Sequence, residues 1–153
     1  MGNELNITAI KGVTITPLKQ IHGEFGSVFH ALKANEDSFA ALGEAYFSSV
    51  VKGAVKGWKQ HTRMVSNLVV AVGAIKFVVY DPRPDSPTFG QIVETILSPD
   101  THYARLTIQP GLWMGFAGVG EGLNLLLNLS SIMHDPTECN NVPIGSPEIP
   151  YTW

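Results

Sequence analysis

Lys59 and His61 are two titratable side chains that stand two positions apart in residues 54–61, a segment predicted to form a β-strand. Successive side chains of a strand point to opposite faces, so these two are predicted to share one face. A neutral imidazole accepts a proton near neutrality with little tuning, whereas a lysine must first be desolvated. The pair therefore indicates proton-transfer chemistry, with His61 as the stronger candidate base.

Each candidate has a plainer alternative. Lys59 is alternatively a non-catalytic residue that pairs with a carboxylate or reaches a ligand phosphate. His61 is alternatively a core histidine held by hydrogen bonds. Asn128 lies in a further predicted strand, and a buried asparagine must bond either a ligand or a neighbouring strand. Trp58 would stack on a nucleobase or belong to the core, where most aromatic side chains lie. The sequence leaves these alternatives open.

Short apolar segments separated by turn signals about every ten residues predict an all-β protein. Strands are predicted at 13–21, 25–32, 45–51, 54–61, 67–80 with a bend at Gly73, 91–97, 104–109, 112–117 and 124–130. One short helix is predicted near the N-terminus at 35–42, ending at Gly43. Consecutive strands without helices between them favour an antiparallel jelly roll or cupin barrel, predicted to span residues 1–153 as a single domain.

Composition narrows the class of protein. The chain has 153 residues, of which 44% are hydrophobic and 15% charged, which is typical of a globular domain with a sizeable core. A net charge of -3 gives no general attraction to nucleic acid or anionic membrane. The N-terminal residues lack the pattern of a signal peptide, and the apolar run 68–75 is too short to span a membrane. A cytoplasmic protein is therefore expected.

The ligand set of a metal-binding cupin is missing. Such proteins carry a glycine, five residues, His-x-His and a carboxylate, with a further histidine after a later Pro-Gly pair. Here Lys59 occupies the first histidine position, residues 64–67 offer no carboxylate, and Met114 occupies the last histidine position, which leaves His61 alone. One imidazole does not hold a divalent ion, and the single Cys139 excludes a zinc-finger type of site. We predict a barrel without metal or other cofactor.

Four segments carry a resemblance to a known family. They are GAVKGW at 53–58, SPTFG at 86–90 after Asp81, IQPGL at 108–112, and PEIPYTW at 147–153. With them the sequence resembles the dTDP-4-dehydrorhamnose 3,5-epimerases, a metal-free group of cupins, and in particular a short branch of that family. The resemblance covers roughly residues 10–153.

The resemblance implies an enzyme that acts on a nucleoside-diphosphate 4-keto-6-deoxyhexose for polysaccharide or glycoside synthesis. The carbonyl at carbon 4 acidifies the protons at carbons 3 and 5. A base removes one of them, a donor holds the enolate, and an acid returns a proton to the opposite face. The resemblance also implies a homodimer with a nucleotide sugar as its ligand.

The family's acid–base positions hold other residues here. Lys59 stands at the position of the catalytic histidine, and Asn128 at that of the general-acid tyrosine. The aspartate that orients the histidine corresponds to a position near Ser146. With His61 as the candidate base, His61, Lys59 and Asn128 are the predicted catalytic residues.

The ligand-binding positions also differ. Phe25 corresponds to a phosphate-binding arginine and His30 to a nucleotide-contacting glutamate, while Lys56 keeps the charge of a family arginine. The predicted ligand-binding residues are Lys56, His30, Trp58 and Met114. Two functions remain open: an epimerase with an altered acid–base set, or a binding protein that has lost catalysis.

Overall fold

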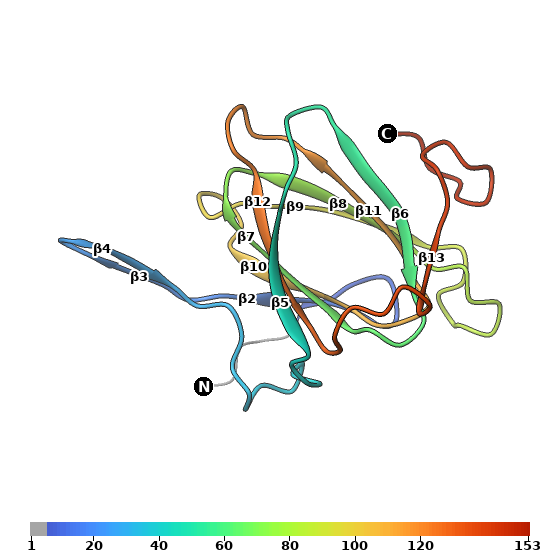
Figure 1. Ribbon diagram of the computed structural model, residues 1–153, viewed down its shortest axis with the longest axis horizontal. Coiled ribbons are helices and arrows are strands. Elements are labelled where there is room, and N and C mark those ends of the chain that lie inside the picture. Colours follow the sequence, from blue (N-terminus) through green and yellow to red (C-terminus); the bar gives the residue numbers. More distant parts are fainter. Residues whose placement is uncertain (1–5) are drawn as a thin grey trace.

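The computed structural model describes residues 6–153, and every regular element in that part of the chain is a β-strand (Figure 1). The strands are β1 (Asn6–Ile7), β2 (Val13–Pro17), β3 (Gln20–Gly23), β4 (Gly26–Phe29), β5 (Glu44–Ser49), β6 (Val55–His61), β7 (Ser66–Val72), β8 (Ile75–Tyr80), β9 (Ile92–Leu97), β10 (Ala104–Ile108), β11 (Trp113–Gly118), β12 (Leu125–Ser130) and β13 (Cys139–Asn141). No helix among these residues is long and apolar enough to cross a bilayer.

The strands form two facing sheets. A six-stranded sheet has the order β1-β2-β10-β7-β12-β5, and a five-stranded sheet the order β13-β6-β11-β8-β9. The neighbours in both sheets are antiparallel, and most are distant in the sequence, as β10 and β2 are. The predicted antiparallel jelly roll is confirmed.

The core lies between these sheets and follows the two-residue alternation of the strands. On β8, Ile75, Phe77 and Val79 join the main core, together with residues such as Leu68 and Leu106 from the opposite sheet. Burying one such side chain stabilises the fold by about 1.5–3 kcal/mol. A smaller apolar cluster on the other face of β8 includes Val78.

The predicted helix at 35–42 is wrong, because this segment forms turns and irregular backbone. Arg105 on β10 is fully buried beneath it. Its guanidinium donates to the carbonyl oxygen of Ala31 at 2.6 Å and also to the Glu36 carboxylate and the Ser38 hydroxyl. Side chains that would support a helix locally are thus bound to a distant strand.

Two predicted strands are each divided into two strands in the structure. The segment 67–80 divides into β7 and β8 at the predicted bend, where Gly73 has a φ of 78°. The predicted strand 13–21 divides into β2 and β3, and the predicted strand 25–32 is shorter, as β4; β3 and β4 form a separate two-stranded sheet. That hairpin extends away from the two main sheets, at the left of Figure 1.

The SPTFG motif belongs to a loop organised by Asp81, which is fully buried at the end of β8. Its carboxylate accepts hydrogen bonds from Arg83 Nε at 2.8 Å and from the hydroxyls of Ser86 and Thr88, both at 2.7 Å. Burial alone would raise the pKa of Asp81, but these hydrogen bonds outweigh it and hold that pKa far below its usual range. The motif therefore has a structural role here.

Candidate active site

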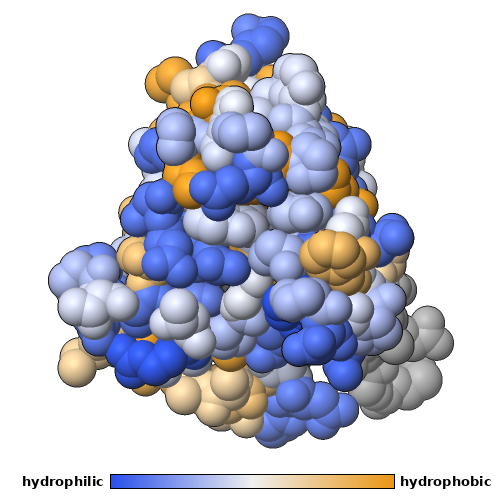
Figure 2. Space-filling model, turned by 90° about the vertical axis from the view of Figure 1, so that its right-hand side faces the viewer, coloured by the Kyte–Doolittle hydropathy of each residue, from blue (hydrophilic) through white to orange (hydrophobic). Residues whose placement is uncertain are grey.

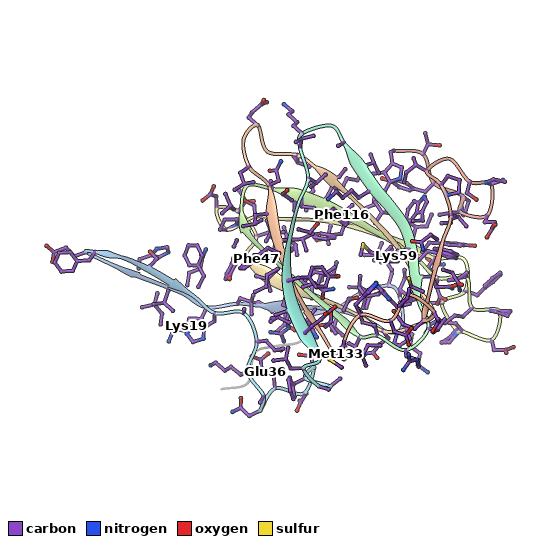
Figure 3. The ribbon with its side chains drawn as sticks, in the orientation of Figure 1. Lys19, Glu36, Phe47, Lys59, Phe116 and Met133 are labelled. Atoms are coloured by element: carbon purple, nitrogen blue, oxygen red, sulfur yellow. The ribbon has the colours of Figure 1, made fainter. Side chains whose placement is uncertain are left out.

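A cavity of about 270 Å³ lies between the two sheets. Strands of both sheets line it: β5, β7 and β12 on one side, and β6, β11 and β13 on the other. Its lining includes Tyr46, Lys56, Lys59, His61, Met114 and Asn128. Five of the predicted site residues thus line one cavity: Lys56, Lys59, His61, Met114 and Asn128. Figure 3 labels Lys59 on β6 and Phe116 on β11, from one wall, and Phe47 on β5, the edge strand of the other sheet.

An irregular pairing of β6 with β11 brings three side chains of β6 to this cavity. Simple alternation would place Lys56 on the face opposite Lys59. In the structure Met114 pairs with Lys59 and Phe116 with Lys56, with a register shift between them. Gly57 permits it, since its φ is 147° and a β-carbon there would lie 2.8 Å from the α-carbon of Gly115.

His61 is oriented by a buried carboxylate. Its Nδ1 is hydrogen-bonded to Oε1 of Glu138, the residue before β13, and the Glu138 side chain is 2% exposed. The other oxygen, Oε2, accepts the backbone N–H groups of Thr62, Arg63 and Met64 at 3.1–3.2 Å. The carboxylate is held by the turn that follows β6, so the imidazole has a fixed partner.

The charge state of Glu138 determines the tautomer of His61. Burial alone would raise the pKa of Glu138, but the hydrogen bonds from His61 and from the backbone of Arg63 and Met64 outweigh it, so the pKa lies below its usual value. An ionised carboxylate only accepts hydrogen bonds, so Nδ1 carries the proton. Nε2 is then the ring nitrogen that is able to accept another proton.

Two ammonium groups give the cavity its charge. Lys56 Nζ donates to the carbonyl oxygen of Ser49 at 2.6 Å and lies 6.0 Å from the centroid of the Phe116 ring. Lys59 forms no ion pair within residues 6–153. Among the described residues that line the cavity there is no Asp or Glu. The cavity is thus suited to an anionic ligand.

Asn128 bonds its neighbouring strands through both ends of its amide. Its Oδ1 accepts the backbone N–H of Asn67 on β7 at 3.2 Å, and its Nδ2 donates to the hydroxyl oxygen of Tyr46 on β5 at 2.9 Å. Asn128 is 3% exposed and Tyr46 is 42% exposed. Of the two alternatives for a buried asparagine, the structure shows bonding to neighbouring strands, at a position that also lines the cavity.

The structure places two predicted ligand-binding residues elsewhere. Trp58, 1% exposed, packs outside the cavity against Tyr151 and Trp153, with ring centroids at 6.0 and 5.4 Å. His30 follows the projecting hairpin, where its carbonyl oxygen accepts a hydrogen bond from Tyr103 at 2.8 Å. Neither lines the cavity.

Sequence reasoning missed Glu138, because the resemblance implies an orienting carboxylate near Ser146. Ser146 lies in the tail loop, where its hydroxyl accepts the backbone N–H of Glu148 at 3.4 Å. The pairing of β13 with β6 sets Cys139 opposite His61 and so brings the preceding residue to the imidazole. No local pattern in the sequence indicates this pairing. Among residues 6–153 no group of three or more His, Cys, Asp or Glu side chains is arranged to hold a metal ion.

A jelly roll whose inter-sheet cavity is lined by a carboxylate-bound imidazole and two ammonium groups defines a cupin-type protein with a charged, titratable pocket. Residues 5–153 match the family model described as dTDP-4-dehydrorhamnose 3,5-epimerase, and the chain belongs to that family. The family predicted from the sequence is confirmed, and nucleotide-sugar epimerisation is the function of that family.

Three relatives illustrate the relationship. The chain is 36% identical to a dTDP sugar isomerase from Desulfovibrio desulfuricans G20, covering 97% of this chain and 94% of that one, with a TM-score of 0.94. It is 27% identical over 128 residues to the probable low-salt glycan biosynthesis epimerase Agl13 of Haloferax volcanii, covering 82% and 81% of the two chains. NovW, a 4-keto-6-deoxy sugar epimerase of Streptomyces spheroides, shares the fold at 24% identity, with a TM-score of 0.87 over 100% of this chain and 80% of that one.

Proposed function

We propose that the protein is an epimerase of nucleoside-diphosphate 4-keto-6-deoxyhexoses, which inverts carbon 3, carbon 5 or both. The observation that carries this proposal is the His61–Glu138 pair at a cavity that also presents two ammonium groups. Removing a proton next to a carbonyl needs an unprotonated base and a donor for the enolate oxygen. A nucleotide sugar also brings two phosphates, which require positive charge.

His61 takes the role of the base in this proposal. Nε2 accepts the proton from the carbon next to the carbonyl, and the electron pair of the broken C–H bond forms the enolate. Glu138 holds the Nδ1 proton and stabilises the imidazolium that results. Lys59 neutralises the enolate oxygen or a phosphate, and Lys56 contributes further positive charge for the diphosphate. Met114 forms part of the apolar wall beside the sugar.

The alternative, a binding protein without catalysis, is less well supported. The three relatives named above are a probable epimerase, a sugar isomerase and a sugar epimerase. Binding alone would also not require a buried carboxylate at the imidazole, since taking an ionised group out of water is costly. Preorganising a base offers a reason for that cost.

We propose in addition that the chain acts as one domain in the cytoplasm and forms a homodimer through its projecting hairpin. The hairpin has four exposed apolar side chains: Phe25 at 97%, Val28 at 58%, Ile21 at 43% and Phe29 at 39%. An isolated two-stranded hairpin is marginally stable in water, so a partner surface would support it. The side of the molecule seen in Figure 2 is by contrast mostly hydrophilic, with separate small apolar groups.

The test is hydrogen exchange in deuterated water with dTDP-4-keto-6-deoxyglucose, followed by NMR at carbons 3 and 5. We expect deuterium at one or both carbons together with the inverted sugar. His61→Asn should reduce the exchange rate about a hundredfold or more. His134→Asn, which changes an exposed histidine, is the matched control and should leave the rate unchanged. A wild-type protein that binds dTDP-sugar and exchanges no proton would leave only the binding function.

A further inference from the structure

We propose that Tyr46 is the acid that returns a proton to the substrate, and that Asn128 positions it. This inference rests on the proposed epimerase function. Tyr46 lies on β5 in the six-stranded sheet, whereas His61 lies on β6 in the five-stranded sheet, and both side chains line the cavity. A planar enolate bound between these sheets would present one face to each wall. Inversion needs the proton to leave from one face and return to the other, so groups on opposite walls suit the two steps.

The hydrogen bonds around Asn128 determine where the Tyr46 proton points. The backbone N–H of Asn67 only donates, so the amide atom that it contacts must be the oxygen Oδ1. The other end of the amide is therefore Nδ2, which donates to the Tyr46 oxygen at 2.9 Å. The Tyr46 oxygen is an acceptor in this bond, and its own proton is directed elsewhere. Since the side chain lines the cavity, the ligand is available as its acceptor.

Strand alternation directs Tyr46 to the cavity and its neighbour Phe47 away from it. Phe47 alternates to the other face of the strand and is 65% exposed (Figure 3). Within the described part of the cavity lining, Tyr46 is the phenol, and no carboxylic acid lies beside it. Ser48 and Ser66 also line the cavity, but an unactivated serine hydroxyl is a much weaker acid than a phenol.

The two steps balance without any further reactant. In the first, a C–H bond next to the carbonyl breaks, the proton passes to Nε2 of His61, and the enolate forms. In the second, the Tyr46 O–H bond breaks, a C–H bond forms on the opposite face, and the carbonyl is restored. The hydrogen bond from Asn128 Nδ2 stabilises the negative charge that develops on the Tyr46 oxygen. Tyr46 is 42% exposed, so water is able to restore its proton while His61 releases one.

Tyr46→Phe separates this role from abstraction by His61. The variant keeps the aromatic ring but has no proton to give, so the enolate forms and is reprotonated from the face it came from. We expect deuterium exchange into the unchanged sugar within about threefold of wild type, while the inverted sugar forms about a hundredfold more slowly or less. Tyr103→Phe is the matched control, because its hydroxyl contacts His30 outside the cavity, and it should leave both rates unchanged.

Asn128→Asp tests the positioning. Its carboxylate would still accept the Asn67 N–H but would also accept the Tyr46 proton, which would turn the phenol away from the ligand. Inversion should again fall more than exchange, although Tyr46 is present. Inversion by Tyr46→Phe near the wild-type rate would overturn the proposal, as would an equal loss of exchange and inversion. Absence of exchange in the wild type would instead refute the proposed epimerase function.

Discussion

Replacing Glu138 by glutamine would change the tautomer of His61 with almost no change in shape. The amide has one oxygen for the four hydrogen bonds that the carboxylate accepts from His61 Nδ1 and from three backbone N–H groups. If the NH₂ group faced the backbone, it would meet the N–H donors of Thr62, Arg63 and Met64. The amide oxygen therefore stays on the backbone side. The NH₂ then faces Nδ1, which must become an acceptor. Nε2 consequently takes the proton and is no longer a base.

The magnitudes follow from this arrangement. Losing general-base catalysis reduces the rate by about 10²–10⁴-fold, which corresponds to about 2.7–5.4 kcal/mol in the activation free energy. The free energy of unfolding should fall by only about 1–3 kcal/mol, because neutral hydrogen bonds replace charge-assisted ones. Glu138→Gln should therefore remain folded and lose most of its activity.

The assay compares proton exchange at carbons 3 and 5 with the thermal unfolding of each variant. Asp135→Asn is the matched control: it removes the same charge from the same turn, where Asp135 binds Arg63 at 2.6 Å on the surface. We expect this control to exchange at the wild-type rate. A folded Glu138→Gln protein with an exchange rate within threefold of wild type would show that Glu138 does not set the tautomer of His61, and that this account of the base is wrong.

Three further changes have definite expected outcomes. Lys59→Met should reduce proton exchange about a hundredfold, and an unaltered exchange rate would exclude Lys59 from the chemistry. Asp81→Asn should lower the free energy of unfolding at pH 7 by about 2–4 kcal/mol in denaturant titrations, because the folded-state pKa of Asp81 lies below its unfolded value. That stabilisation is present above the unfolded pKa and is lost as pH falls toward the folded one, so the variant's stability should depend less on pH below about 5; equal pH dependence would contradict the assignment. Phe25→Ser with Val28→Ser should convert a dimer to a monomer in light scattering, whereas an unchanged mass would place the interface elsewhere.

The sequence predicts the fold because strand signals are local. Alternation and turn residues within ten positions indicate the strands, and Gly73 marks the bend between β7 and β8. The helix prediction at 35–42 failed where a local preference competed with a long-range one. Arg105 is fully buried and needs acceptors, and the loop supplies Glu36 and Ser38. The sequence of the loop alone does not identify Arg105 as its partner.

The site is less predictable for the same reason. Lys56 faces the cavity because the pairing of β6 with β11 is irregular. The sequence of β6 alone does not indicate how it pairs with β11. Glu138 is 77 positions from His61, and Asn128 is 82 positions from Tyr46. Contacts over such distances arise from the order of strands in the sheets. Spacing along one strand, as for Lys59 and His61, is all that the sequence itself provides.

In the proposed mechanism the site differs from the family pattern and keeps groups for acid–base chemistry. Lys59 replaces the histidine predicted from the resemblance, but His61 lines the same cavity from two positions further along the strand. A base moved along β6 needs a carboxylate at a new place, and β13, paired with the end of β6, brings Glu138 there. Likewise Asn128 replaces the tyrosine, and the phenol of Tyr46 lies on the adjacent strand, bonded to that asparagine. The replaced histidine, aspartate and tyrosine are thus each accompanied by a group of the same chemical type on the same strand, or on or next to a strand paired with it. This pairing of losses and gains favours a displaced catalytic set over a decayed one.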